Sequence, residues 1–591
     1  MNNRMHLLWL MVSCVAFQPA RADIWVGADN NCQFQSIQSA LNLLETGSDS
    51  VIKIANNINN GVYLENLTLD LSNAPGSMLI QGGYDSCEGN FIATPVTIDG
   101  GSNGPVFQIT GDGDTQSLNL SKLVIKNGLF DPVDERSGGL NVIGDELRLL
   151  LNEVTISQNS GWKGGGFFAR GVNQTVNMYH VNMFNNTAQN GGGLACELSR
   201  VSLFEETGIA FNTAASGLPD QGNGGGVYAD SGCVVALYTG DQSVAGFAGI
   251  VGNQASTHGG GVYVQGQGLF STVRLSADVI PVIKENLADS NNDGNGFGGG
   301  VYVTGDGSVA TLNQAVVTDN AAANGGAVAA ELLGRVNIYP ASTSCAMNQP
   351  CTRFTGNTAG ANVSGVSVGA GGAFYATTGA YMRVVRSLIE EHRADSGVVA
   401  AVNSGGYISY ASSLITDNGG PAQAGLSDNY LLLSIDDDSR ITLGNVTLAN
   451  NQINESLMLL AFGATMDVEY SIITDASADV LESFNDSGQP VFSSYKCSVL
   501  HEIQSISGAD INTQNVQSVV DHFVDSAGRD YHLDPASPAV DLCADSTSWN
   551  VDIDGQDWAL DDPDVANLHG AFDAGADETY RSDVLFADDF D

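Results

Sequence analysis

Positive charge is scarce in this 591-residue chain, which holds 21 Lys and Arg side chains against 66 Asp and Glu. The first 22 residues contain two of the basic side chains and no acidic one, so the rest has 19 basic against 66 acidic groups, a net charge of −47. Such a charge repels the phosphates of nucleic acids and the surface of an anionic membrane. We therefore exclude both as partners and expect a soluble extracellular protein.

Long apolar runs are also missing after the N-terminus, because no later stretch reaches the eighteen or so apolar residues of a membrane helix. At the start, Arg4 precedes the short apolar run LLWLMVSCVAF, and residues 20–22 form an A-x-A-type cleavage site. These features predict a signal peptide over residues 1–22, a mature chain that begins at Asp23, and export to the extracellular space or the outer-membrane surface. A lipoprotein anchored at Cys14 is the alternative, but the apolar run continues past this cysteine.

Cysteine is sparse, at nine residues, and no pair has the C-x2-C spacing of common zinc sites. Removal of Cys14 with the signal peptide leaves eight, and an even number in an exported chain favours disulfides over zinc binding. Sequence alone does not fix the connectivity. Proximity along the chain suggests the pairs Cys32–Cys87, Cys196–Cys233, Cys345–Cys351 and Cys497–Cys543.

Glycine, in contrast, is abundant, with 71 residues, and much of it stands in a recurring motif. The stretch 184–195 reads FNNTAQNGGGLA, in which an asparagine-containing signal precedes the glycines and an apolar residue follows them. Similar runs recur at intervals of 27 to 46 residues, which marks a repeat architecture. Their first glycines are Gly164, Gly191, Gly224, Gly259, Gly298, Gly325, Gly371 and Gly405. Asparagine signals occur at 185–188, 211–214, 252–255, 319–322 and 356–359.

Short alternating segments rich in β-branched residues, such as 174–184 and 308–320, separate the glycine runs and predict half-buried strands. No helical segment long enough to connect parallel strands lies between them, so the strands must coil directly onto one another. The sequence therefore predicts an all-β fold, a single-stranded right-handed parallel β-helix of the pectate-lyase type. We expect the glycines to turn the chain with positive φ or close backbone approach, and the next apolar residue to enter the core. We also expect the asparagines to stack as hydrogen-bonded ladders from coil to coil.

The two ends of the chain differ from the repeats. Residues 34–46 carry apolar side chains at helical spacing, with Ser36 as a possible N-cap, which predicts a short helix over the open end of the first coil. After about residue 480 the repeat signal fades. The expected domains are a signal peptide at 1–22, an N-terminal cap at 23–60, the β-helix at 61–484, a C-terminal domain at 485–580 and an acidic tail at 581–591.

Several stretches also carry a family resemblance. IQGGYDSCEGNFIATPVTIDGG at 80–101 resembles the N-terminal coils of bacterial right-handed β-helix repeat proteins. The glycine runs, with FTGN at 354–357, resemble the repeats of chlamydial-type polymorphic outer-membrane proteins. DYHLDPASPAVD at 530–541, DIDG at 552–555 and DAGADE at 573–578 resemble the choice-of-anchor domain that ends such exported proteins. The resemblance implies an extracellular or outer-membrane-associated location, and it implies no reaction.

Many β-helices cleave acidic polysaccharides, so a polysaccharide lyase or glycoside hydrolase is the alternative function. A lyase needs an Arg or Lys base, but the only clustered pair within the coils, Arg383 and Arg386, is expected to be solvated on opposite strand faces. A hydrolase needs paired carboxylates, and the three aspartates at 436–438 are expected to form an acidic loop, while His258 lies in an ordinary repeat turn. The sequence therefore assigns no catalytic residue.

Two acidic loops have the spacing of a calcium site. One matches the first half of a D-x-N-x-D-G loop, whose alternate oxygens can converge on one hard cation, but its twelfth position is Gly300 rather than the Glu of an EF-hand. A solvated turn is the alternative for each loop. Calcium is the only cofactor that the sequence suggests. The candidate ligands are Asp289, Asn291 and Asp293 in the first loop and Asp552, Asp554 and Asp557 in the second.

A solenoid presents an extended surface to ligands. On this ground the sequence predicts an exported, adhesin-like binding protein, secreted or attached to the cell surface, rather than an enzyme. Its expected partner is an extracellular glycan or a host or cell-surface component, bound in adhesion or cell-envelope interaction.

Overall fold

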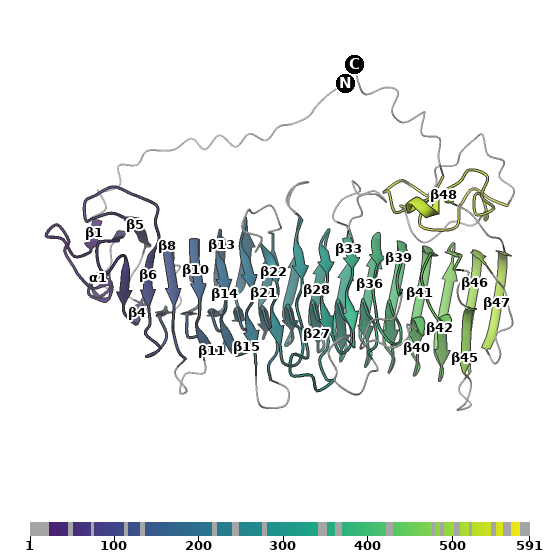
Figure 1. Cartoon of the computed structure of the whole chain (residues 1–591), viewed down its shortest axis with the longest axis horizontal. Helices are drawn as coiled ribbons and strands as arrows, with labels where there is room; N and C mark the ends of the chain where they lie inside the picture. Colours follow the sequence, from purple (N-terminus) through teal and green to yellow (C-terminus); the bar gives the residue numbers. More distant parts are fainter. Residues whose placement is uncertain are drawn as a thin grey trace, which may run out of the picture.

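In the computed structural model the chain forms an elongated, solenoid-like stack of strands that runs from the purple N-terminal end to the green C-terminal end (Figure 1). The expected all-β class with parallel sheets is confirmed. The expected signal peptide at 1–22, the pair Cys345–Cys351 and the acidic tail at 581–591 lie outside the residues that the structure describes. Those residues are 23–44, 51–72, 76–111, 116–130, 136–215, 221–238, 248–274, 280–340, 352–360, 369–420, 430–475, 479–484, 490–501, 509–518, 523–544, 551–558 and 569–579.

Within the described residues two long parallel sheets run along the solenoid, sheet A with 27 strands and sheet B with 14. Each strand pairs with the equivalent strand of the next coil, so that Leu194 at the start of one sheet-B strand pairs with Val227 at the start of the next. Sheet A has two rows separated by a bend, which long strands such as Arg148–Ser157 span. It continues past residue 484, through Val491–Leu500 and Ala509–Ser518.

The first row of sheet A consists of β1 (Asp23–Val26), β2 (Val51–Ala55), β5 (Ser77–Tyr84), β8 (Ser117–Lys126), β10 (Arg148–Ser157), β13 (Thr175–Tyr179), β17 (Arg200–Phe204), β21 (Val234–Leu237), β25 (Leu269–Thr272), β28 (Val309–Leu312), β32 (Arg335–Ile338), β36 (Tyr381–Val385), β39 (Tyr407–Thr416), β41 (Arg440–Ala449), β43 (Thr465–Glu469), β46 (Val491–Leu500) and β47 (Ala509–Ser518). The second row adds β3 (Val62–Leu64), β6 (Val96–Asp99), β14 (Asn182–Phe184), β18 (Gly208–Ala210), β22 (Gly249–Val251), β26 (Val282–Lys284), β29 (Val316–Thr318), β33 (Thr352–Thr355), β37 (Ser387–Glu390) and β44 (Ile472–Ile473).

Sheet B consists of β4 (Leu67–Asp70), β7 (Phe107–Thr110), β9 (Leu140–Ile143), β12 (Phe167–Arg170), β16 (Leu194–Glu197), β20 (Val227–Asp230), β24 (Val262–Val264), β27 (Val301–Thr304), β31 (Val328–Glu331), β35 (Phe374–Ala376), β38 (Ala400–Val402), β40 (Leu431–Ile435), β42 (Ser456–Ala461) and β45 (Asp479–Phe484). Short connecting strands form two small parallel sheets, β11 (Ser160–Lys163), β15 (Thr187–Asn190), β19 (Thr213–Ala214) and β23 (Gln254–Ala255), and β30 (Ala321–Ala322) and β34 (Thr358–Ala359).

The glycine runs turn the chain into the next strand with positive φ, as predicted, and in seven of the eight runs this strand belongs to sheet B. The first glycines of seven runs have φ between 64° and 72°, and the apolar residue that follows, such as Leu194 or Val227, is buried in the core. The eighth run also has the predicted positive φ, 74° at Gly405, but it leads into the other long sheet. Gly405 leads into β39 of sheet A, whereas Gly397, three residues before the partner of Phe374, holds the equivalent place before β38. Because a coil has more than one tight turn, the motif alone does not distinguish them.

A ladder of buried side chains runs along the coils, which confirms the predicted asparagine stack. At each asparagine step the backbone N–H and the side-chain Nδ2 of one residue donate to Oδ1 of the next, at 3.0 Å each from Asn186 to Asn212. A histidine replaces one asparagine, and an aspartate ends the series. The rungs are Asn159, Asn186, Asn212, Asn253, Asn286, Asn320, Asn357, His392, Asn418, Asn451 and Asp475.

The predicted N-terminal helix is present as α1 (Ile37–Leu44). The Oγ of Ser36 accepts a hydrogen bond from the backbone N–H of Ser39 at 3.3 Å, so this residue is the expected N-cap. Ile37 and Leu41 are buried in the same apolar cluster as the solenoid core. Among the residues that the structure describes, no helix has the length and hydropathy needed to cross a lipid bilayer.

Three of the four suggested cysteine pairs lie at disulfide distance. Cys32 pairs with Cys87 near the N-terminal end, and Cys196 on β16 pairs with Cys233 in the adjacent coil. The third pair joins Cys497 on β46 to Cys543, beyond the last strand of sheet A. This third bond fastens the C-terminal segment to the solenoid.

Candidate functional site

The second row of sheet A turns a continuous face outward along the solenoid. Met183, Ile209 and Ile250 in this row belong to the core, and their neighbours face outward because successive side chains of a strand alternate between its two faces. We call these outward positions the outer flank. One column comprises Thr155, Asn182, Gly208, Gly249, Val282, Val316, Arg353, Leu388, Leu414, Thr447, Ile472 and Val499, and the other Ser157, Phe184, Ala210, Val251, Lys284, Thr318, Thr355, Glu390, Thr416 and Ala449.

An open cavity of about 320 Å³ lies on the outer flank where β10, β14 and β18 pair. On β18 the outward positions are Gly208 and Ala210, so the surface is recessed between the larger side chains of the neighbouring residues. The cavity is lined by Thr155, Asn182, Met183, Phe184, Asn185, Gly208, Ala210 and Phe211.

Phe211 forms one wall of this cavity, just after β18. The residue has a φ of 55°, and 45% of its surface is exposed. Its ring lies over Gly252 of the next coil, where an added Cβ would come within 2.6 Å of the ring atom Cε1. A glycine at 252 is therefore required for the ring to take this position.

The chemistry of the lining suits a sugar ring. The volume falls within the usual range for small-molecule sites, about 300–1,000 Å³. The rings of Phe184 and Phe211 can face the C–H groups of a pyranose, while the side-chain amides of Asn182 and Asn185 can donate to and accept from its hydroxyl groups. None of the eight described lining residues has a titratable side chain, so none of these eight can act as a general acid or base.

An aromatic stack stands at the bend that precedes this row of strands. The rings of Tyr179, Phe204 and Tyr238 lie parallel within 11°, with successive centroids 4.8 and 4.6 Å apart. His180 continues the chain from Tyr179, and its Nε2 lies 3.1 Å from a carboxylate oxygen of Glu205. The bend therefore places aromatic rings and polar side chains next to the row of strands that holds the cavity.

A second cavity, of about 430 Å³, lies near the N-terminal end beside β4 and β7. Its amide group from Asn66 is already engaged, because Nδ2 donates to the carbonyl oxygens of Gly104 at 3.1 Å and Pro105 at 2.9 Å. We therefore regard the cavity at Phe184 and Phe211 as the stronger candidate.

The C-terminal part of the outer flank is occupied by the chain itself. We call residues 523–544, 551–558 and 569–579 the C-terminal module, which includes β48 (Phe523–Asp525). This module lies against the green end of the solenoid (Figure 1). Tyr531 and Ile553 belong to one apolar cluster with flank residues of β37, β39 and β41. A second cluster joins the module to Ile472 and Val499. The module thus covers the flank from β37 to β46, while the cavity lies at β10 to β18.

Hydrogen bonds fix the module in this position. The Oγ of Ser412 donates to the carbonyl oxygen of Val551 at 2.8 Å, and the backbone N–H of Ala576 donates to Oγ1 of Thr447 at 2.9 Å. Within the module, β48 pairs with β49 (Asp530–Leu533) in antiparallel fashion around the 3₁₀ turn Ser526–Gly528. These contacts and the third disulfide fix one arrangement of the module.

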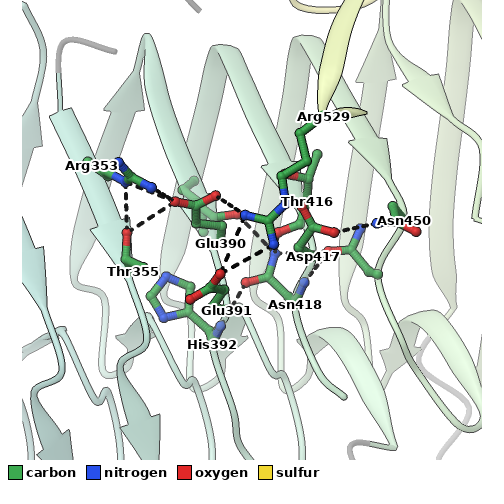
Figure 2. A network of polar contacts seen from close by, with 12 residues as sticks. Arg353, Thr355, Glu390, Glu391, His392, Thr416, Asp417, Asn418, Asn450 and Arg529 are labelled. Atoms are coloured by element: carbon green, nitrogen blue, oxygen red, sulfur yellow. Dashed lines mark hydrogen bonds and ion pairs between the residues drawn. The ribbon is translucent and has the colours of Figure 1, made fainter. Parts of the chain in front are cut away.

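Figure 2 shows the polar network at the edge of the module, with Glu390 between Arg353 and Arg529. The guanidinium of Arg529, on the module, lies 3.3 Å from carboxylate oxygens of Asp417 and of Glu391 and 3.5 Å from Glu390. Arg353 donates through Nε to Glu390 at 2.8 Å. The neighbouring Asp417 raises the pKa of Arg529 further, but half of this side chain is exposed, so the ion pairs orient the module more than they stabilise it.

The structure corrects the expectation that Arg386 is solvated. Its side chain is 1% exposed and lies beneath the module, where Nε and Nη2 donate to the carbonyl oxygen of Ile553 at 3.3 and 3.2 Å. Burial lowers the pKa of this guanidinium, and nearby Asp552 opposes the shift. Arg386 stands at the bend between β36 and β37, with a φ of 49°, so strand alternation does not describe it. Arg383 is exposed, as expected.

The residues considered for a hydrolase have structural surroundings. Asp437, with a φ of 51°, lies in the turn between β40 and β41 and accepts a hydrogen bond from Ser404 at 3.1 Å, which confirms the expected loop. His258 stacks between aromatic side chains on the outside of sheet B, 5.0 Å from the ring of Phe297 and 4.7 Å from that of Tyr302. Its Nδ1 accepts the backbone N–H of Phe297 at 3.2 Å.

The first candidate calcium loop is closed by its own hydrogen bonds. The carboxylate of Asp289 is 1% exposed and accepts the backbone N–H groups of Asp293 at 3.0 Å and Gly294 at 3.1 Å. The side-chain amide of Asn291 donates to Asp293 at 2.8 Å. Burial raises the pKa of Asp289 to about 6, against the effect of these amides.

The three aspartates of the second candidate calcium site differ in burial and in hydrogen-bond partners. One oxygen of Asp552 accepts the backbone N–H of Gln556 at 2.7 Å, and burial raises the pKa of this aspartate to about 7. Asp557 is exposed and pairs through its backbone with Val551. Asp554 instead hydrogen-bonds to His532, and this bond raises the pKa of His532 to about 10.

Two kinds of site residue escape a reading of the sequence. Phe184 and Phe211 look like ordinary repeat residues, and only the alternation along β14 indicates that Phe184 faces outward. His532 approaches Asp554 from 22 residues away, a separation that matches no ligand motif. In comparisons with known proteins, no family model matches the chain, and no curated protein matches it at a significant level.

Proposed function

We propose that the chain is an exported right-handed parallel β-helix that binds a glycan through the outer flank, at the cavity between Phe184 and Phe211. It acts at the cell surface, in adhesion or cell-envelope interaction, or as a secreted protein, without cleaving its ligand. The observation that carries the proposal is the cavity itself, whose two phenyl rings and two asparagine amides match the apolar and hydroxyl sides of a sugar.

The right-handed winding is supported by a general rule of chain connection. Parallel strands of one sheet are connected with a right-handed crossover in about 98% of cases. Here equivalent strands of successive coils pair in parallel, as β13 does with β17 and β16 with β20. The repeat-like and anchor-like stretches at 354–357 and 530–541 support an outer-membrane-associated or extracellular location, as does the net charge of −47 after residue 22.

Binding rather than cleavage is favoured by the lining of the cavity. A glycoside hydrolase places two carboxyl groups about 5–9.5 Å apart across the bond that it cleaves, and a lyase needs a base at the sugar proton. The cavity offers hydroxyl, amide and phenyl groups instead. A host or cell-surface glycan chain of neutral sugars would suit these groups, because the acidic surface repels anionic polymers.

The test uses the secreted chain and a panel of immobilised polysaccharides, scored for retention and for new reducing or unsaturated ends. We expect retention on at least one neutral glycan, no cleavage products, and loss of retention in Phe184→Ala and Phe211→Ala. Phe462→Ala is the matched control, because this phenylalanine is 40% exposed in a turn between β42 and β43. Cleavage products would support the enzyme instead, and equal retention by all variants would exclude the cavity.

A further inference from the structure

Three side chains that commonly bind metals meet within the C-terminal module. His532 on β49, Asp554 and Asp577 each offer one ligand atom, and these atoms all lie within 4.8 Å of one another. The Nε2 of His532 is 3.0 Å from Oδ2 of Asp554. The three residues come from the three separate segments of the module.

The imidazole of His532 is already oriented as a ligand would need to be. Its other nitrogen, Nδ1, hydrogen-bonds to Asp530 on the same strand, which directs Nε2 toward the two aspartates. Histidines that bind metals almost always hold the second nitrogen in this way, often on a carboxylate. Asp577 is fixed independently, because its Oδ2 accepts the backbone N–H of Leu533 at 2.9 Å.

The cluster is closed toward the solenoid and open toward solvent. The side chain of His532 is 39% exposed and that of Asp554 is 10% exposed, while Asp577 is buried. An ion can therefore approach from the side of the histidine. On the inner side lie the buried Asp552 and Arg386.

The geometry points to a divalent cation of the zinc type, bound by Nε2 of His532 and by one carboxylate oxygen each of Asp554 and Asp577. One imidazole with two carboxylates is a donor set that zinc accepts, whereas calcium takes oxygen ligands alone. Bonds of about 2.0–2.2 Å place tetrahedral ligand atoms about 3.4 Å apart. The 3.0 Å between His532 and Asp554 therefore has to widen slightly, and ligand atoms up to 4.8 Å apart have to close by about 1.4 Å at most. The fourth position remains for water.

Charge balance favours the same ion. Asp530, Asp554 and Asp577 place three carboxylates around one imidazole, at least one of them buried, and unbalanced charge is costly in such surroundings. A divalent cation at Nε2 takes the place of the proton on that nitrogen, and so supplies one more positive charge than the imidazolium does. Because it would tie the three segments of the module together, the ion would hold the module on the outer flank. This inference does not depend on glycan binding.

The test is calorimetric titration of the chelator-treated chain with zinc chloride, alongside calcium chloride. We expect one zinc ion per chain, binding at least tenfold weaker in His532→Gln and Asp577→Asn, and no competition from calcium. His180→Gln is the matched control, because His180 also contacts two carboxylates, those of Glu205 and Glu206, and its side chain is 41% exposed, close to the 39% of His532, but it lies outside the module. Zinc affinity in this control should equal that of the parent chain.

Two results would overturn the inference: no zinc binding by the parent chain, or binding that both variants retain. Thermal melts establish whether each variant folds, and Asp554→Asn, which keeps the side-chain volume, serves if either does not. Cobalt chloride added to the parent chain gives a readout without any variant. Visible absorption bands of a low-symmetry nitrogen and oxygen site are expected, and the spectrum of the free hydrated ion would contradict the site.

Discussion

The side-chain amide of Asn186 donates simultaneously to Oδ1 of Asn212, at 3.0 Å, and to the carbonyl oxygen of Ile156, at 2.9 Å. The side chain of Asn186 thus satisfies two backbone groups of the preceding coil, because its Oδ1 also accepts the backbone N–H of Asn159. Because these groups are buried, the ladder fixes the spacing of the coils as well as their turns.

Removal of one rung should therefore be costly. Asn212→Ala leaves the backbone N–H of Asn186 and the carbonyl oxygen of Met183 without their partner, and each unsatisfied buried group costs about 1–3 kcal/mol. We expect the free energy of unfolding to fall by about 2–5 kcal/mol in chemical denaturation. Asn177→Ala, at a half-exposed position of β13, should change it by less than about 0.5 kcal/mol. Equal effects of the two substitutions would contradict the role of the ladder.

His392 is the one imidazole in the ladder and should make the fold sensitive to acid. Its Nδ1 accepts the backbone N–H of Asn357 at 3.1 Å, and complete burial lowers the pKa of the ring to about 3, from 6.5. The folded state therefore holds this histidine neutral, while the unfolded chain binds a proton below pH 6.5. Its contribution to stability is complete above pH 6.5 and declines by about 1.4 kcal/mol per pH unit as the pH falls toward 3.

His392→Asn should remove this sensitivity, because an asparagine can take the same place between Asn357 and Asn418. Between pH 6.5 and pH 5 the parent chain should lose about 2 kcal/mol more stability than the variant. The measurement is denaturant unfolding of both chains at the two pH values. A parallel decline in the two chains would show that other groups cause the acid response.

The repeated features of this fold could be predicted because each depends on a short stretch of chain. Gly191 needs positive φ wherever its coil lies. An asparagine equivalent to Asn186 precedes the glycines in most repeats. Contacts between distant segments could not be predicted in this way. Arg386 was expected in solvent because nothing near it in sequence reveals Ile553, which is 167 residues away. The approach of His532 to Asp577 could not be predicted for the same reason, because the two residues are distant in the sequence.

The cavity on the outer flank shows the same limit. The sequence indicates that Phe184 faces outward, but the position of Phe211 depends on the space above Gly252 in the next coil. That space depends on how neighbouring coils align, and the alignment depends on the lengths of the loops between the strands. The solenoid class was therefore predictable, and the shape of its surface was not.

The glycine turns should not tolerate side chains. Gly191 has a φ of 68°, and a Cβ on Gly192 would lie 2.5 Å from the carbonyl oxygen of Gly225 in the next coil. We expect the double substitution Gly191→Val and Gly192→Val to cost at least about 3 kcal/mol, through strain at the first position and collision at the second. The control is Gly104→Ala, where the only atom near an added Cβ is 3.8 Å away. Unchanged melting of the double variant would refute the turn assignment.

The bond between Cys497 and Cys543 should govern the attachment of the C-terminal module. It closes a separation of 46 residues, for which loop entropy predicts a stabilisation of about 4 kcal/mol. Serine at both positions should expose the module to limited proteolysis while the solenoid resists.

In the parent chain, which should begin at Asp23, thiol labelling after denaturation without reductant should give no signal. A stoichiometric adduct would contradict the pairing.

Calcium should raise the melting temperature more than magnesium, by replacing internal hydrogen bonds in the loop of Asp289, Asn291 and Asp293, such as that from Asn291 to Asp293. The net charge of −47 beyond residue 22 repels itself. The exposed carboxylate of Asp293 lies beside Asp289, whose pKa is raised chiefly by burial and further by the charge of Asp293. A cation that binds only the folded state at a hundredfold excess over Kd adds about 2.7 kcal/mol. Magnesium at equal ionic strength controls for screening, because it prefers small octahedral sites that keep water.

Asp293→Ala should abolish the difference between the two ions. Asp438→Ala, in the turn before β41, removes an acidic side chain elsewhere and should leave the difference intact. Equal shifts with both ions in the parent chain would show only general screening of the acidic surface. A calcium effect that survives in Asp293→Ala but disappears in Asp554→Ala would place the ion in the C-terminal module, where it would compete with zinc for the same carboxylate. Titration of one ion against the other would then show which ion binds the module more tightly. Tighter zinc binding indicates a site that includes His532, and tighter calcium binding indicates a site of oxygen ligands alone.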